Sequence, residues 1–507
     1  MKKTIILLLF TLFAGVLSAQ TVNIQGGGSY PTIAAAITAA VPGDVILITG
    51  THTETISIDK SITLRGANPA TDIIQAAAAP STLGGGTRVI GIGAATAAAL
   101  NVTVENLTIR HGNITGANGG GIFVDKVTGL VNLNNLIVTN NFTTTNGGGI
   151  GAAGSNVNIT NCTVQNNSCT LDGGAIIAAP NNAAAIDNVV TISQSLLNAN
   201  TARNGGGIYI NGNLNSGNTY KIAVNIENST ISNNTASSAS SGNGGGAILS
   251  LSQPWTTTPT IGNVTLRLVH TTVYNNTHLN LLRAGLQFLA PTATAPTNFS
   301  AYNSIIVGKD DLTATGPKAI NFTNTNITNI VNCIFGGTTL PPTIVSDPVP
   351  NTFNNQAGKS AAHAGITGTL SNEGGSTQVF KLDTPANTAV DYCTVATGIS
   401  IPSIDQRGYS RTGTYDAGAY ETGATLSVGE EMYNSSAVSI YPNPARELVS
   451  ISGLNNVNSI KVYSILGSLE KEIYNQNEFN VSDLSAGLHL VMIEGDGQQI
   501  MKRIVVK

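Results

Sequence analysis

Charged residues, aromatic residues and cysteines are all scarce in this 507-residue chain. Only 10% of the residues are charged and 5% are aromatic, and the chain has four cysteines and one tryptophan. Because an average globular protein is about one quarter charged, this composition argues against long amphipathic helices and coiled coils. The 23 Lys and Arg are thinly spread and the formal net charge is −4, so we expect no nucleic acid partner. A chain of this length needs no disulfide staples, and we assign the cysteines no functional role.

The first 19 residues have the order of a secretory signal peptide. Lys2 and Lys3 precede a mostly apolar run that ends in Leu17-Ser18-Ala19, and such signals share this charged, apolar and small-residue order. We therefore expect cleavage after Ala19. The alternative, a membrane anchor, needs about 18 or more apolar residues. No later segment has that character, so we expect no transmembrane segment after signal removal.

A single pattern recurs eight times between residues 102 and 335. It reads apolar, any, apolar, any, Asn, small or apolar, any, apolar. The apolar positions step by two, then three, then two, so each copy holds two short strands separated by a tight bend. Asn is the residue best able, after Gly, to adopt the left-handed conformation of such a bend, and its side chain can bond to the Asn of the next copy. We therefore predict a structural ladder of asparagines: Asn106, Asn135, Asn161, Asn228, Asn303 and Asn332, with Gln194 and His270 in the two remaining copies.

Five copies are followed by a glycine cluster that opens a further strand, as in Asn118-Gly119-Gly120-Gly121-Ile122. Each repeat is thus expected to hold three strands, and successive bends lie 26 to 42 residues apart. A unit of that size without a helical pattern cannot close a core alone, so it must stack on its neighbours as a coil. The competing folds, a barrel or a sandwich, need hairpin turns about every 8 to 12 residues. The sequence therefore predicts an all-β chain with a parallel β-helix solenoid over residues 20–345.

The residues before the repeats resemble the opening of a known fold. Ile33, Ala36, Ile37 and Ala40 form one helical stripe, which predicts a short N-terminal capping helix. This stretch and the one that follows, up to residue 66, resemble the first coils of pectin-lyase-like β-helix proteins, and the resemblance implies a right-handed solenoid. The Gly-Gly-Gly-Ile and Asn-Asn repeats are similar to those of chlamydial polymorphic outer-membrane proteins, where they are structural.

Residues 346–421 resemble the choice-of-anchor Q module, which closes a β-helix and precedes a surface-anchoring signal. Thr388 stands where that family usually has Pro. Paired Arg and carboxylate groups at the end of a rod satisfy one another's hydrogen bonds, which favours a structural role over a catalytic one. This argument concerns the densest charge cluster of the chain: Asp405, Arg407, Arg411, Asp416 and Glu421.

Residues 422–437 are aperiodic and predict a linker, whereas residues 438–507 alternate apolar and polar residues in short strands, which predicts a small C-terminal antiparallel β-sandwich. This last segment resembles the type A C-terminal sorting domain of the type IX secretion system of Bacteroidota. The resemblance implies a secreted protein at the outer surface of a Gram-negative bacterium, with the secretion machinery as its partner. The sorting residues that it implies are Tyr441, Pro442, Asn443, Pro444, Gly467, Asp483, Leu484, Gly487, Lys502 and Lys507, and His489 stands where the family usually has Tyr.

The repeats contain no pattern that points to catalysis. Lyases and hydrolases of the pectin-lyase group gather carboxylates in one groove, whereas the acids between Gly86 and Ser300 lie on different repeats and at different phases: Glu105, Asp125, Asp172, Asp187 and Glu227. We assign no catalytic, cofactor-binding or metal residue. Asp310-Asp311 offers two carboxylates to a cation such as calcium, but a solvated loop is the commoner explanation. His111 and His270 are interpreted as bend residues, and Cys162 and Cys333 as buried thiols.

Two functions from different classes remain open. The first is a non-catalytic adhesin, surface-structure or glycan-contacting protein, for which a long face of Thr, Ser and Asn supplies hydrogen bonds to an extracellular polysaccharide or a neighbouring surface. The second is a polysaccharide lyase or glycoside hydrolase that acts in a groove formed by long loops near residues 211–219 and 234–260. Carboxylates that converge from neighbouring coils favour the enzyme, and a smooth polar face favours the binding protein.

Overall fold

A computed structural model describes residues 20–181, 186–212, 220–238, 244–252, 254–255, 258–279, 285–289, 296–308, 319–321, 325–336, 353–366, 368–383, 388–424, 438–454, 456–464, 469–495 and 498–507. The predicted signal peptide, Asp310-Asp311, Gly467, most of the linker, most of the loop at residues 211–219 and part of the loop at residues 234–260 lie outside these ranges. The chain divides into two compact units, Met1–Thr425 and Leu426–Lys507. No helix in the described part is long and apolar enough to cross a bilayer.

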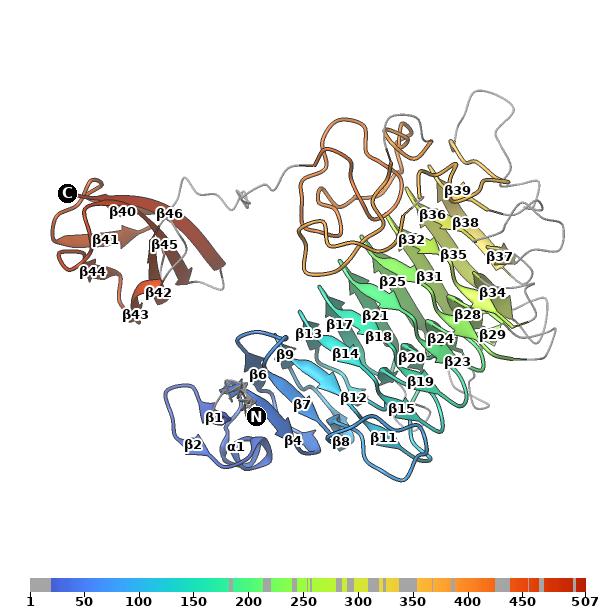
Figure 1. Cartoon of the computed structure of the whole chain (residues 1–507), viewed down its shortest axis with the longest axis horizontal. Coiled ribbons are helices and arrows are strands. Elements are labelled where there is room, and N and C mark those ends of the chain that lie inside the picture. The colour runs from blue at the N-terminus through green and yellow to red at the C-terminus, as the bar shows by residue number, and fades with distance from the viewer. Residues whose placement is uncertain are drawn as a thin grey trace, which may run out of the picture. The chain divides into compact units, whose positions relative to one another are not determined.

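The N-terminal end of the solenoid is covered as the helical stripe predicts. Strands β1 (Thr21–Ile24) and β2 (Ser29–Tyr30) pair antiparallel and lead into helix α1 (Ile33–Ala39). Thr32 caps the helix by accepting a hydrogen bond from the amide of Ala35 at 3.1 Å, and the carboxylate of Glu54 accepts the amides of Ile33 and Ala34 at 3.0 and 3.1 Å. An N-terminal hydroxyl and a carboxylate both stabilise the free amides of a first turn. The buried stripe of α1 therefore closes the first coil (Figure 1).

Four parallel sheets run along the solenoid, and β1 joins the first of them antiparallel. Sheet 1 holds β3 (Val45–Thr49), β6 (Thr63–Gly66), β9 (Val102–Glu105), β13 (Val131–Asn134), β17 (Asn156–Thr160), β21 (Asn188–Ser193), β25 (Ile222–Glu227), β31 (Val264–Val269), β35 (Thr297–Tyr302) and β38 (Thr325–Val331). Sheet 2 holds β4 (Thr51–Thr53), β7 (Ile73–Gln75), β10 (Thr108–Arg110), β14 (Ile137–Thr139), β18 (Thr163–Gln165), β22 (Leu196–Asn198), β26 (Thr230–Ser232), β32 (Thr272–Tyr274), β36 (Ile305–Val307) and β39 (Ile334–Phe335).

Sheets 3 and 4 complete the coils. Sheet 3 holds the two-residue strands β11 (Asn113–Ile114), β15 (Phe142–Thr143), β19 (Ser168–Cys169), β23 (Thr201–Ala202), β27 (Thr235–Ala236) and β33 (Thr277–His278). Sheet 4 holds β5 (Ile56–Ile58), β8 (Ile90–Ala98), β12 (Ile122–Val127), β16 (Ile150–Ala153), β20 (Ile176–Ala179), β24 (Ile208–Asn211), β28 (Ile248–Leu251), β34 (Leu286–Leu289) and β37 (Ile320–Asn321). The strands β29 (Pro254–Trp255) and β30 (Thr258–Gly262) form a separate antiparallel pair.

The parallel β-helix is confirmed, but the expectation of three strands in each repeat is wrong. From β9 to β34 each coil has four strands, because a second tight bend separates the strand of sheet 2 from a short strand of sheet 3. The glycine clusters do open a strand, and Ile122 and Ile150 begin β12 and β16. A side chain on Gly148 would overlap the carbonyl group of Ser168 in the next coil, so only glycine fits there.

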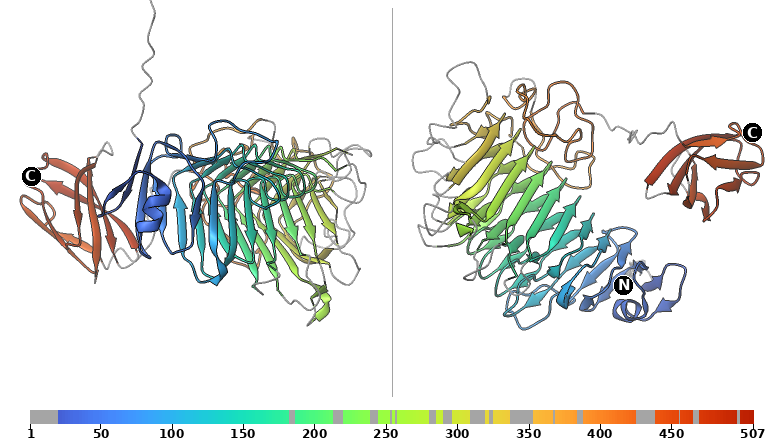
Figure 2. Two further views of the ribbon diagram at one scale, coloured as in Figure 1. Left: turned by 90° about the horizontal axis from the view of Figure 1, so that it is seen from below. Right: turned by 180° about the vertical axis from the view of Figure 1, so that it is seen from behind.

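One continuous apolar core fills the interior of the coils. Inward positions stack in register from coil to coil: Val104 lies beside Leu133, and Leu133 lies beside Ile159. All three side chains are fully buried. Each coil buries its apolar face only against its neighbours, which is the stability logic of repeat proteins. Figure 2 shows the stacked strands from two further directions.

The segment after the last coil has little regular structure and packs against the side of the solenoid (Figure 1). Its described parts are residues 353–366, 368–383 and 388–424. We call residues 353–424 the docking segment. Asn354 at its start takes the left-handed bend conformation with a φ of 49°, and its side-chain Nδ2 donates to Oδ1 of Asn332 at 3.1 Å. The bend column thus continues past residue 345, where the repeat pattern of the sequence ends.

The C-terminal unit is a small antiparallel β structure with its own core, as expected. Val449, Ile460, Val491 and Ile504 are among the side chains buried between its two sheets. One sheet has the order β40 (Ser439–Tyr441), β41 (Leu448–Ser452), β44 (Glu478–Asn480). The other has the order β43 (Leu469–Tyr474), β42 (Val457–Ser464), β45 (Gly487–Gly495), β46 (Gln498–Val506).

Candidate functional site

The six asparagines of the predicted ladder all lie at the bend between sheets 1 and 2. Their φ angles are positive, between 43° and 57°, and Gln194 and His270 have the same conformation in the two other coils. Side-chain bonds join several rungs: Nδ2 of Asn135 donates to Oδ1 of Asn106 at 2.9 Å, and Asn332 donates to Asn303 at 2.9 Å. Asn106, Asn135 and Asn161 are partly exposed, whereas Asn228, Asn303 and Asn332 are buried.

A second asparagine ladder, which the repeat pattern did not reveal, lines the bend between sheets 2 and 3. Asn141, Asn167, Asn200, Asn234 and Asn276 are almost completely buried. Nδ2 of each of the first four donates to Oδ1 of the next at 2.9 to 3.0 Å. The residue before each of them has a positive φ. In each of these coils this positive-φ residue lies five positions after the residue of the first bend. The Asn-Asn dipeptides at that distance were therefore the sequence signal for the second ladder.

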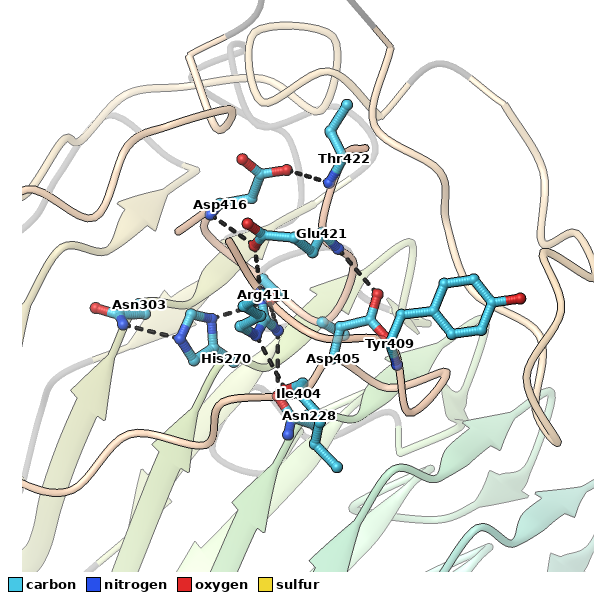
Figure 3. Close-up of polar contacts among 12 residues, drawn as sticks. Asn228, His270, Asn303, Ile404, Asp405, Tyr409, Arg411, Asp416, Glu421 and Thr422 are labelled. Carbon is cyan, nitrogen blue, oxygen red and sulfur yellow. Dashed lines mark hydrogen bonds and ion pairs between the residues drawn. The ribbon is translucent and has the colours of Figure 1, made fainter. Parts of the chain in front are cut away.

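The docking segment binds directly to the first ladder. Arg411 donates through Nη2 to Oδ1 of Asn228 at 3.1 Å, and the backbone of Val395 exchanges two hydrogen bonds with the side chain of Asn332. His270 lies between the two parts: its Nε2 accepts from Asn303 at 2.9 Å, and its Nδ1 donates to the carbonyl oxygen of Gly418 at 3.3 Å (Figure 3). The ladder therefore serves as the attachment line for residues 353–424.

One half of the predicted charge cluster is an ion pair held between two aromatic rings. Nη2 of Arg407 lies 2.6 Å from Oδ2 of Asp405, and Nε donates to the same oxygen at 2.8 Å. The guanidinium group packs over the rings of Tyr409 and Tyr420, with distances of 4.4 and 3.9 Å to their centroids. Asp405 also accepts the amide of Glu421 at 3.2 Å. The ion pair, its hydrogen bonds and the two aromatic rings therefore hold this loop together.

The other half of the cluster is a completely buried pair. Nη1 of Arg411 lies 2.9 Å from Oε2 of Glu421, and the same oxygen accepts the amide of Asp416 at 3.0 Å (Figure 3). Burial raises the pKa of both Asp416 and Glu421 and lowers the pKa of Arg411. Both side chains are buried and all three nitrogens of Arg411 donate hydrogen bonds, which supports the structural interpretation of the cluster over the catalytic one.

The docking segment covers outward side chains that become apolar in the last coils. In one outward column of sheet 1, Val269, Tyr302 and Val331 lie side by side, and Val395, Ile399 and Ile401 pack on them. On sheet 2, the ring of Phe380 meets Tyr274 edge to face at 5.0 Å between centroids. Apolar outward residues need such a cover in water, so the segment is part of the fold.

The outward face of sheet 1 is polar where the docking segment does not reach. Two columns of partly exposed side chains run from β9 to β21: Thr103, Asn132, Asn158 and Thr191 in one, and Glu105, Asn134, Thr160 and Ser193 in the other. Neighbours bond to each other, as Asn158 does to Asn132 at 3.2 Å and Thr160 to Ser193 at 3.1 Å. We call these eight residues the polar face.

The carboxylates of the described solenoid residues do not converge. Glu105 and Glu227 share one column of sheet 1 but lie four coils apart, which is about 19 Å at the usual strand spacing. Paired catalytic carboxylates of glycosidases lie within about 10 Å. Asp172, which precedes the glycines before β20, accepts hydrogen bonds from Arg203 at 3.0 Å and from Asn204 at 2.8 Å. Asp125 accepts from Asn181 at 2.6 Å. Among described residues, no cluster of three His, Cys, Asp or Glu has the geometry of a metal site.

The histidines and cysteines singled out in the sequence have structural surroundings. His111 lies at the second bend with a φ of 61°, and its Nδ1 bonds to the carbonyl oxygen of Ala77 at 3.0 Å. Burial lowers the pKa of His111 and lowers that of His270 further. Cys162 and Cys333 are fully buried free thiols, and burial raises the pKa of each to about 12. Such thiols are poor nucleophiles.

Two of the sorting motifs, far apart in the sequence, meet in the C-terminal unit. The side chain of Asn443 donates to the carbonyl oxygen of Arg503 at 2.8 Å and accepts the amide of Val505 at 3.0 Å, and Tyr441–Pro442 and Asn443–Pro444 are cis. Lys507 donates its amide to Ala445 at 2.9 Å. The segment from Tyr441 to Ala445 is therefore fixed to the end of β46.

The remaining sorting residues are spread over the same unit. Asp483 pairs with Lys471 at 2.7 Å, Leu484 packs against the core, and Gly487 opens β45 with a φ of 144°. Lys502 lies in β46 and is partly buried. Gly467 lies outside the described residues.

Comparison with known proteins separates the two units. Residues 439–507 match the family of secretion system C-terminal sorting domains, so the type IX sorting domain inferred from the motifs is confirmed and marks the chain as a secreted or cell-surface protein. No curated protein matches the chain. Among solved structures, the crystal structure of pectate lyase Pel9A is similar, with 13% identity, 77% of this chain and 90% of that chain covered, and a TM-score of 0.37.

Proposed function

We propose that this protein is a surface-displayed, non-catalytic adhesin or surface-structure protein that contacts neutral polysaccharide through the polar face. The export step rests on the sorting domain, which directs the chain to the type IX secretion system. The binding step rests on the solenoid. The docking segment resembles the choice-of-anchor Q module, and this resemblance implies that it closes the solenoid ahead of the sorting domain. That the segment belongs to this family stays a prediction.

The polar face is the observation that carries the proposal. Its Asn, Thr and Ser side chains both donate and accept hydrogen bonds, and they repeat at the spacing of the coils, about 4.8 Å. Glu105, its one acid, is paired with Arg65. A flat, neutral face of this kind suits the hydroxyl groups of an uncharged sugar polymer better than it suits a strongly charged ligand.

The experiment is to incubate the purified mature chain with a panel of neutral and acidic polysaccharides, with and without calcium. We expect retention on one or more insoluble polysaccharides and no shortened or unsaturated products by mass spectrometry. A variant with Asn132→Leu and Asn158→Leu should lose that retention, whereas Asn156→Leu outside the two columns should keep it. Reproducible products would instead establish the alternative, a polysaccharide lyase or glycoside hydrolase.

A further inference from the structure

One face of the C-terminal unit carries an apolar surface that no other described residue of this unit covers. In the sheet β43–β42–β45–β46, Leu469 pairs with Tyr463, Tyr463 with Leu490, and Leu490 with Arg503. Directly paired residues of antiparallel strands project to the same side, so Tyr463, Leu490 and Arg503 form one row across β42, β45 and β46. The register between β42 and β43 shifts at Tyr463, and the exposed Leu469 begins β43 beside the end of this row. Leu488 and Val505 form a neighbouring pair in β45 and β46. We call these six residues the sorting face.

The sorting face is turned away from the core of the unit. The alternate residues of the same strands, such as Ile460, Val491 and Ile504, are fully buried on the other side. In contrast, Leu469, Leu488 and Val505 are 50%, 43% and 38% exposed. The apolar character of this face therefore does nothing for the fold of the unit itself.

Exposed apolar side chains are concentrated in this part of the chain. Among the described residues, eleven large apolar side chains are exposed, and six of them lie in the C-terminal unit, which makes up about one sixth of the chain. Single exposed apolar residues need no explanation, but contiguous ones mark interaction surfaces. The docking segment covers the outward apolar column of sheet 1 at Val269, Tyr302 and Val331, whereas no described residue of the C-terminal unit does the same for the sorting face.

The charges beside this surface indicate what kind of partner fits. Arg503 and Val505 alternate along β46 and Lys507 follows the strand, all three being exposed. Within the described residues neither Arg503 nor Lys507 forms an ion pair, whereas Lys461 on the same side is neutralised by Glu472 at 3.1 Å. The surface is thus apolar with a basic edge, and a complementary partner is apolar with carboxylates along one edge.

We propose that the sorting face is the surface by which this chain docks onto a component of the type IX secretion machinery that presents an apolar patch bordered by carboxylates. The proposal rests on the match to the sorting-domain family, because that match supplies the partner. Tyr463, Leu469, Leu488, Leu490 and Val505 provide the apolar contact. Arg503 and Lys507 orient the unit on the partner by pairing with its acids.

The test measures export of the full chain from a bacterium that has this secretion system. The main variant combines Leu469→Thr, Leu488→Thr and Val505→Thr, because Thr is polar yet favours strands. The matched control is Leu448→Thr, since Leu448 is 51% exposed but lies in the other sheet. A second variant, Arg503→Glu, reverses the edge charge without touching the core. Thermal unfolding of each purified chain verifies the fold, and deletion of residues 438–507 verifies the sorting role.

We expect the triple variant to lower the exported fraction at least about tenfold, with the chain retained in the periplasm, because anchors at the centre of an interface carry most of its affinity. Arg503→Glu should lower export in the same direction and Leu448→Thr should leave it unchanged. Two results overturn the proposal, provided that the deletion still blocks export. One is normal export of a folded triple variant, and the other is retention of Leu448→Thr in the periplasm to the same extent as the triple variant. Normal export of the deletion overturns the sorting role itself. If the parent chain is a dimer by sedimentation and the triple variant is a fully exported monomer, the face binds a second copy instead.

Discussion

Arg411 and Asn228 are separated by 183 residues, yet Nη2 of the arginine donates to Oδ1 of the asparagine at 3.1 Å inside a completely buried site. The bond joins the docking segment to a rung of the first asparagine ladder. The first asparagine ladder thus has two roles. It forms the bend between sheets 1 and 2 in each coil, and it binds the docking segment.

Replacement of Arg411 should loosen the docking segment. The variant Arg411→Met leaves Glu421 charged and unpaired in a buried site, and breaking such a pair costs about 3–5 kcal/mol. We expect a lower unfolding midpoint and faster amide hydrogen exchange over residues 388–424. The double variant Arg411→Met/Glu421→Leu should recover part of the loss, whereas Lys381→Met, which removes an exposed partner of Glu373, should change stability by less than about 1 kcal/mol. An Arg411→Met chain with parental exchange rates would contradict the locking role.

His270 should make the same contact sensitive to acid. Burial, followed by the charge of Arg411, lowers the pKa of His270 in the folded chain, so the imidazole stays neutral there while the unfolded chain binds a proton below about pH 6.5. Stability from this group is therefore present above that pH and is lost as the pH falls, by up to about 1.4 kcal/mol per pH unit.

The variant His270→Asn supplies the residue found at this bend in other coils and removes the titrating group. Urea unfolding of the parent and the variant at several values between pH 7 and pH 5 should show a smaller loss of stability in the variant. Parallel pH profiles for the two chains would mean that His270 is not the source. Burial and the charge of Lys359 also lower the pKa of His363 in the docking segment. The variant His363→Asn therefore measures how much of the loss comes from that second histidine.

The second ladder should contribute more to stability than the polar face does. In Asn167→Ala the carbonyl oxygen of Val138 loses its donor and the side chain of Asn141 loses its acceptor, and each buried group left without a partner costs about 1–3 kcal/mol. Asn158→Ala, in the polar face, should cost under about 1 kcal/mol because water replaces its bond. Chemical denaturation of both variants makes the comparison, and equal effects would refute it.

Ala199 is the one position of the second bend, from Asn140 to Asn275, at which an alanine takes the left-handed conformation, with a φ of 54°. An L-residue other than Gly, Asn or Asp pays roughly 1–2 kcal/mol for that conformation. We therefore expect Ala199→Asn to stabilise the chain by about 1 kcal/mol or less. A rise in the thermal midpoint checks this, with Ala202→Asn, a buried strand position, as the destabilising control.

The periodic parts of this structure could be predicted from sequence, and the aperiodic parts could not. The left-handed bends at Asn106 and its equivalents follow from a local step in the apolar pattern, and Ile122 and its equivalents begin strands because glycines precede them. The two-residue strands of sheet 3 were missed because they are too short to show alternation. The docking position of Arg411 was missed because it depends on contacts with Asn228 and Gly418, which no local pattern encodes. The change from Ser193 to Val269 and Tyr302 along one column was the signal that this end of the solenoid is covered.

The division of the outward columns into a polar part and a covered part has a consequence for how this protein can vary in length. The strands of the coils that carry the polar face pair only with strands of the coil before and the coil after, and no described residue of the docking segment bonds to β9, β13 or β17. Insertion of one further coil there would move the capping helix outward by about 4.8 Å and leave every contact of Arg411 and His270 as it is. A chain with one coil more would therefore be longer by one coil spacing while the end against which the docking segment packs stays unchanged.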